Sequence, residues 1–106
     1  MPVKKQFLKS KPVVKVTFEI EAEAARNASA AYVVCEASGW QKEPLKKQKN
    51  GAFKGVLELP TDSQDDYEYR YCLELDGSEI YDNDWQAESY RPCPLGGENS
   101  VVSVRA

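Results

Sequence analysis

The sequence predicts an all-β domain, an antiparallel sandwich of about seven short strands. Apolar residues alternate with polar ones at the two-residue period of a strand, turn residues divide the chain at short intervals, and no segment carries an apolar stripe at helical period. A chain of 106 residues supports one compact domain with one modest core. We therefore expect a single domain over residues 12–106, preceded by a flexible polar segment over residues 1–11.

The first predicted strand covers Pro12–Ile20, because its apolar residues fall on one face and its polar residues on the other. Residues 21–29 have some helix propensity but no apolar stripe, so we expect a loop with at most one turn. The apolar run Ala30–Glu36 is the second predicted strand. Leu45–Lys49 and Ala52–Leu59 read as a hairpin, because Asn-Gly favours the two positive φ angles of a type I′ turn.

The clearest strand pattern covers residues 67–75. Three tyrosines and two leucines share one face, and Glu68, Arg70, Cys72 and Glu74 share the other. An Asp-Gly turn leads into a short segment, Glu79–Tyr81, and a long loop over residues 82–98 precedes a final strand, Ser100–Arg105. Seven such strands without a strong helix predict a two-sheet sandwich of immunoglobulin type.

Histidine is absent, which removes the usual general base near neutral pH and the commonest metal ligand. The three cysteines lack C-x-x-C spacing, so neither a disulfide framework nor a zinc site is indicated, and we expect reduced thiols. The composition therefore predicts a protein that is not an enzyme and that uses no metal or cofactor.

Charge is distributed unevenly along the chain. Residues 1–54 carry eleven basic and five acidic residues, and residues 55–106 carry three basic and twelve acidic ones. The net charge of -3 and the lack of a nucleic-acid motif favour solvated lysines over nucleic-acid binding. The N-terminal residues have no apolar stretch of signal-peptide length, and nowhere do 18 apolar residues run together. We expect a soluble cytoplasmic protein without membrane or nucleic-acid partners.

Two tryptophans, Trp40 and Trp85, fall in predicted loops, and Tyr81 adjoins one of them. A loop tryptophan can plug the end of a sandwich, or its exposed ring can stack on the C-H face of a sugar while nearby polar groups bind the hydroxyls. The acidic run in YDNDW matches neither the cleft carboxylates of glycosidases nor an EF-hand calcium loop, and is typical of a turn with backbone-capping side chains.

Four segments together resemble a known family across nearly the whole chain. They are KKQFLKSKPVVKVTFEI, the Trp40 region with PLKKQKNGAFKGVLELP, YEYRYCLELDG, and YDNDWQAESYRPCPLGGENSVV. They resemble the glycogen-binding, early-set immunoglobulin-like domain that precedes the barrel of isoamylases and branching enzymes and occurs in the β subunit of AMP-activated protein kinase. The short, stand-alone bacterial proteins of this type are the most similar.

This resemblance implies non-catalytic binding of an α-1,4-glucan such as glycogen or starch. The matching positions imply that Trp40 and Tyr81 stack on glucosyl rings, that Arg70 and Asn99 bind hydroxyls, and that Leu95 makes an apolar contact. The alternative is an interaction or scaffold module of the same fold that has lost the sugar site and docks on a separate glycan-active enzyme. The deciding geometry is whether Trp40, Tyr81 and Arg70 meet on one exposed surface.

Overall fold

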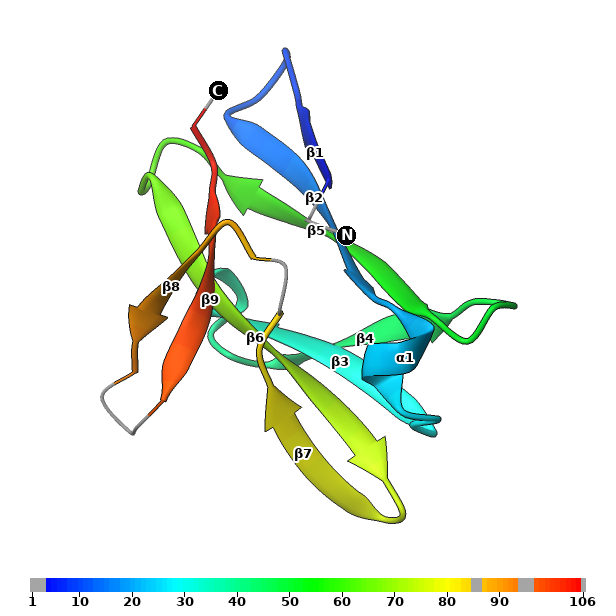
Figure 1. Ribbon diagram of the computed structural model, residues 1–106. Coiled ribbons are helices and arrows are strands. Elements are labelled where there is room, and N and C mark those ends of the chain that lie inside the picture. Colours follow the sequence, from blue (N-terminus) through cyan, green and yellow to red (C-terminus); the bar gives the residue numbers. More distant parts are fainter. Residues whose placement is uncertain (1–3, 85–86, 94–96, 106) are drawn as a thin grey trace.

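The computed structural model describes residues 4–84, 87–93 and 97–105, which form a curled antiparallel sheet (Figure 1). A four-residue helix, α1 (Ala22–Ala25), and a 3₁₀ turn, η1 (Glu36–Ser38), are the helical elements of this part of the chain. The strands are β1 (Lys4–Phe7), β2 (Val13–Ile20), β3 (Ala30–Cys35), β4 (Lys42–Lys47), β5 (Phe53–Pro60), β6 (Asp66–Leu75), β7 (Ser78–Asp82), β8 (Ser89–Pro92) and β9 (Glu98–Ser103).

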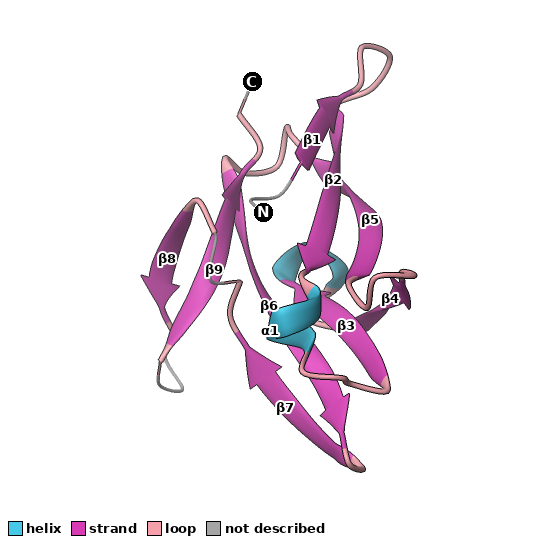
Figure 2. Ribbon diagram, turned by 45° about the vertical axis from the view of Figure 1, so that its right-hand side comes forward, coloured by secondary structure: helices cyan, strands magenta, loops and turns pink. Residues whose placement is uncertain are grey.

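The strands pair in the order β1-β2-β5-β4-β3-β6-β9-β8, and β7 adds to β6 beside this path. The sheet curls into a half-barrel, with β1 at one end of the strand order and β8 at the other (Figure 2). One ion pair joins these ends, because Lys5 Nζ on β1 lies 2.5 Å from Glu88 Oε2 just before β8. The all-β antiparallel class predicted from the sequence is confirmed.

The concave side of the sheet holds the core, as the two-residue period predicts. Four of the five apolar residues of β2 and the tyrosines of β6 are buried there, and Val13 is half-buried. Phe18 of β2 contacts Tyr69 of β6 edge to face, with ring centroids 4.9 Å apart, so the two walls of the half-barrel meet directly. The core also includes Leu45, Phe53, Leu59, Ala31, Val33, Cys35, Leu73, Val102 and Val104.

The buried tyrosines of β6 find partners for their hydroxyl groups on other elements. The Tyr67 hydroxyl donates to the carbonyl of Pro60 at 2.8 Å, and the Tyr69 hydroxyl donates to the Asp84 carboxylate at 2.7 Å. Tyr71 reaches the Glu19 carbonyl at 3.5 Å. Each tyrosine thus places its ring in the core, and its hydroxyl group forms a hydrogen bond with another element, as buried hydroxyls require.

Two strands lie where the sequence predicted none. Lys4–Phe7, within the segment expected to be flexible, pairs with Thr17–Val14 as β1. Phe7 lies opposite the buried Val14 in this register, although Phe7 itself is exposed. Ser89–Pro92, within the predicted long loop, pairs with β9 as β8. Both strands are four residues long and mostly exposed, so they lack the alternating pattern that identifies a strand.

The predicted two-residue type I′ turn at Asn50-Gly51 is wrong. Gly51 has a positive φ of 92° but Asn50 does not, and its side chain instead accepts a hydrogen bond from the Ala52 N–H. Gly51 N–H donates to the Gln48 carbonyl, and Gln48 N–H donates to the Ala52 carbonyl. This is a three-residue loop in which the glycine forms a bulge, the second common way to close a hairpin. The predicted single turn in residues 21–29 is confirmed as α1.

Candidate functional site

An open hollow of about 590 Å³ lies on the convex side of the sheet, on the outer face of β6. On one side β6 pairs with β3 from Tyr69 to Glu74, and on the other its partner changes from β9, up to Tyr69, to β7, from Tyr71. Arg70 lies at this change of partner and pairs only with Val34 of β3. The hollow is lined by Val34, Trp40, Glu68, Arg70, Tyr81, Cys93 and Asn99.

Alternation along β6 places Arg70 in the hollow. Tyr69 and Tyr71 point into the core, so the residue between them points outward. The ladder between β6 and β9 pairs Glu68 with Val101 and ends at the pair Tyr69 and Ser100. If it continued by one residue, Arg70 would pair with Asn99. The hollow is therefore the place where β9 and β7 diverge and leave the outer face of β6 uncovered.

Trp40 reaches the hollow through an unusual backbone. The turn η1 ends at Gly39 with φ 68°, and Trp40 itself has φ 63°, a region that bulky side chains rarely adopt. Its N–H donates to the Cys35 carbonyl at 2.9 Å, which closes the turn. The side chain remains 44% exposed. A left-handed tryptophan costs about 1 kcal/mol or more, and such strain is concentrated at functional sites.

Tyr81 enters the hollow from β7. It pairs with Cys72 of β6 and is 48% exposed, so about half of the residue is open to solvent. The hairpin that carries it closes tightly at Asp76 and Gly77, both of which have positive φ angles. Trp40 follows β3 and Tyr81 lies on β7, and these two strands flank β6. The two exposed aromatic residues therefore approach one hollow from opposite sides of β6.

Arg70 is the unpaired cation of this site. Its Nε atom is buried without a hydrogen-bond partner, and its side chain makes no ion pair with any residue the structure describes. Gly97, with φ 72°, lies beside the guanidinium, since a Cβ at that position would be 3.4 Å from Nη2. A guanidinium without an internal acceptor is suited to donate hydrogen bonds to the oxygen atoms of a ligand.

Glu68 and Asn99 form a network beside Arg70. Asn99 Nδ2 donates to Glu68 Oε1 at 2.9 Å, and Arg91 Nη1 donates to Glu68 Oε2 at 3.2 Å. Arg91 also pairs with Asp66 at 3.0 Å, and these two hydrogen bonds raise the pKa of Arg91. Both carboxylate oxygens of Glu68 are thus engaged, and the amide of Asn99 is oriented with its Nδ2 toward Glu68.

The cysteines differ in accessibility. Burial raises the pKa of Cys35 to about 11 and also raises the pKa of Cys72, which Lys42 partly offsets. Cys93, in contrast, is only half-buried and lines the hollow. All three are free thiols. Cys93 is therefore the thiol best placed to report on what occupies the site.

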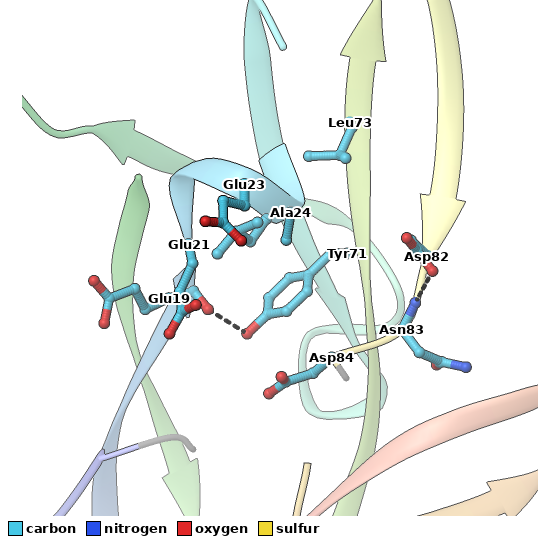
Figure 3. A pocket seen from close by; sticks show the side chains of 10 residues that line it. Glu19, Glu21, Glu23, Ala24, Tyr71, Leu73, Asp82, Asn83 and Asp84 are labelled. Carbon is cyan, nitrogen blue, oxygen red and sulfur yellow. Dashed lines mark hydrogen bonds between the residues drawn. The ribbon is translucent and has the colours of Figure 1, made fainter. Parts of the chain in front are cut away.

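A second, smaller pocket of about 150 Å³ is lined by Tyr71, whose side chain points away from the outer face of β6, and by several acidic residues (Figure 3). The end of β2, α1 and residues 82–84 surround it. Asn83 N–H donates to the Asp82 carboxylate at 2.8 Å, which is the backbone capping expected of the YDNDW segment. Among the described residues, no group of acids, cysteines or histidines is arranged to hold a metal ion.

The structure brings together four of the five residues named from the resemblance: Trp40, Arg70, Tyr81 and Asn99. Asn99 is only 5% exposed, so it offers the hollow less surface than expected. Leu95 lies outside the described residues. The hollow also contains residues that sequence reasoning missed. Glu68 could have been found because it shares the outer face with Arg70, whereas Val34 and Cys93 carry no local signal.

No protein-family model matches the chain, and no curated protein matches it significantly. In the part of the chain that the structure describes, no helix is long and apolar enough to cross a membrane.

Proposed function

We propose that this chain is a non-catalytic module that binds α-1,4-glucan in the hollow on the outer face of β6. The observation that carries the proposal is the presence of two exposed aromatic rings and an unpaired guanidinium around one open hollow. Aromatic rings stack on the apolar faces of glucosyl units, and the guanidinium and amide supply hydrogen bonds to hydroxyl groups.

The charges of the hollow support binding without hydrolysis. Glycoside hydrolysis needs two carboxyl groups on opposite sides of the scissile bond. Glu68 is the one acidic residue among the described residues that line the hollow, and both of its oxygens already accept hydrogen bonds. The described lining of the hollow therefore supports binding of a polysaccharide without its cleavage.

We also propose that the curled sheet is an early-set form of the immunoglobulin-like sandwich. Between β4 and β5 only two residue pairs connect the halves of the sheet, Lys46 with Lys54 and Lys47 with Phe53. The halves face each other across the core, where Phe18 meets Tyr69. An experimental structure tests this assignment, since two stacked layers about 10 Å apart are expected.

Titration with maltoheptaose tests the binding proposal. In a Trp85→Phe background the remaining indole is Trp40, so its fluorescence should change on binding, with a dissociation constant on the order of micromolar to millimolar. Trp40→Ala should abolish binding measured by amide chemical shifts. Phe7→Ala, which removes another exposed ring outside the hollow, should leave it unchanged.

Thiol labelling gives an independent readout of the same site. Because Cys93 lines the hollow, saturating maltoheptaose should slow its reaction with a thiol reagent. An absence of both fluorescence change and protection would rule out glucan binding. In that case co-purification with a separate glycan-active enzyme, lost in Trp40→Ala, would favour the docking alternative.

A further inference from the structure

The free strand edges of the sheet are not equally guarded against pairing with another chain. Natural proteins protect such edges with lysine, proline or covering side chains. Strand β1 carries Lys4 and Lys5, and β8 ends at Pro92. Where β4 and β5 diverge, Leu45 packs against Gly55, at 2.7 Å from the position a Cβ would take.

Strand β7 is less guarded: among the described residues, the one such protection is Lys42 of β4, which pairs with the side chain of Glu79. Its residues Ser78–Asp82 contain neither lysine nor proline, and it pairs with β6 alone among the described strands. Both views of the molecule show β7 as the outermost strand of a projecting hairpin (Figures 1 and 2). Ile80 is 37% exposed on this strand, next to Tyr81.

The hairpin register identifies which backbone groups of β7 are free. Leu75 and Ser78 close a two-residue turn, and in such a hairpin the closing pair exchanges both hydrogen bonds. Hydrogen-bonded and non-hydrogen-bonded pairs alternate from there, so Ile80 bonds to Leu73. The N–H and C=O groups of Glu79 and Tyr81 therefore point away from β6.

These free groups are complementary to themselves. If two β7 strands lie antiparallel about a two-fold axis at Ile80, Glu79 of each copy faces Tyr81 of the other, and about four backbone hydrogen bonds form. Ile80 then faces its own equivalent, and Ser78 faces Asp82. Like charges directly opposite each other would oppose pairing, and this register places none in that position.

We propose that the chain pairs with a second copy of itself through β7, forming a continuous sheet across a two-fold axis. The contact is small compared with stable dimer interfaces, which bury more than about 1,000 Å². The association is therefore weak, with monomer and dimer in exchange at ordinary concentrations.

The paired sheet would have a functional consequence, which rests on the proposed glucan binding. A two-fold axis perpendicular to the sheet leaves both hollows on the same side, with three strand spacings, about 14 Å, between the two β6 strands. A long glucan could then occupy both hollows at once, and the second binding event would benefit from a high effective concentration. A short oligosaccharide would not gain in this way.

A proline at position 79 tests the pairing directly. Glu79→Pro removes an N–H that points away from β6, so the hairpin ladder keeps its hydrogen bonds. Glu79→Ala is the matched control, because it also removes the ion pair with Lys42 but keeps the N–H. Sedimentation over a concentration series should show dimerisation of the native chain and of Glu79→Ala, and a monomer for Glu79→Pro.

A second variant guards against misfolding of the proline variant. Ile80→Lys places like charges opposite each other on the two-fold axis, whereas Ile80→Val keeps the apolar contact. We expect the lysine variant to be monomeric and the valine variant to dimerise. A native chain that stays monomeric at every concentration, or a dimer that persists in both Glu79→Pro and Ile80→Lys, would overturn the proposal.

Comparing glycogen with maltoheptaose separates this proposal from the proposed function. We expect native protein to bind glycogen at least tenfold more tightly per site than maltoheptaose, and the Glu79→Pro variant to lose that difference. Equal binding of both glucans by the native dimer would overturn the two-site consequence. Dimerisation without any glucan binding would contradict the proposed function and leave the β7 contact standing.

Discussion

The two faces of β6 differ in whether their buried polar atoms have hydrogen-bond partners. On the concave face, Tyr67, Tyr69 and Tyr71 are buried, and each hydroxyl has an acceptor on another element. On the convex face, Arg70 has a buried nitrogen without a partner, although an acid two residues away lines the same hollow. One strand thus stabilises the fold with satisfied side chains on one face and carries an unsatisfied nitrogen on the other, at the site where we propose that glucan binds.

The largest expected effect is on the concave face. Tyr69→Ala removes a fully buried ring that contacts both Phe18 and Tyr71, so it should reduce the free energy of unfolding by about 3 to 5 kcal/mol. Tyr69→Phe removes only the hydroxyl that donates to Asp84 and should cost about 1 to 3 kcal/mol. Chemical denaturation measures both. Equal losses would mean that the ring contributes little.

Alkaline pH should also weaken the concave face. Burial raises the pKa of Cys35 to about 11, above its ordinary value of 9.0, so between these values the unfolded state loses a proton that the folded state keeps. The contribution of this group to stability is therefore full below pH 9 and is lost as the pH rises through 11, a loss of about 3 kcal/mol. Cys35→Ala should flatten that part of the curve. An unchanged slope in denaturation experiments would contradict this assignment.

A change at Arg70 should instead affect binding. Arg70→Met keeps an unbranched apolar stem but removes the donors, so we expect at least a tenfold loss of maltoheptaose affinity, or about 1.4 kcal/mol. Stability should change by no more than about 0.5 kcal/mol, because the arginine makes no ion pair with the described residues. Calorimetry and denaturation of one sample separate the effects. A large loss of stability would make Arg70 structural.

The smallest effect, and of opposite sign, is expected at Trp40. Trp40→Gly relieves the positive φ of 63°, so stability should rise by about 1 kcal/mol while glucan binding is lost. Trp40→Ala is the matched control, because it also loses the ring but keeps most of the backbone strain. Thermal unfolding compares the two variants. Equal melting temperatures would mean that the strained backbone stores no energy.

Local pattern predicted the concave side of the sheet well. The alternation in Pro12–Ile20 and in residues 67–75 identified both walls of the core, because burial on one face imposes a period of two. The short edge strands Lys4–Phe7 and Ser89–Pro92 escaped prediction, since exposed strands need no apolar alternation. Asn50-Gly51 suggested the wrong turn, because the same dipeptide suits both a two-residue turn and a three-residue loop with a bulge.

The amino-acid sequence by itself determined the all-β class, the faces of the main strands and the outward direction of Arg70, because these depend on residues close together in the chain. Only the tertiary structure decided that Trp40, Arg70, Tyr81 and Asn99 share one hollow, that Glu68 and Cys93 join them, and that β7 is left with an open edge. These features depend on where β6 exchanges one partner strand for another. Packing between segments far apart in the chain determines this exchange, so the local pattern of apolar and polar residues cannot predict it.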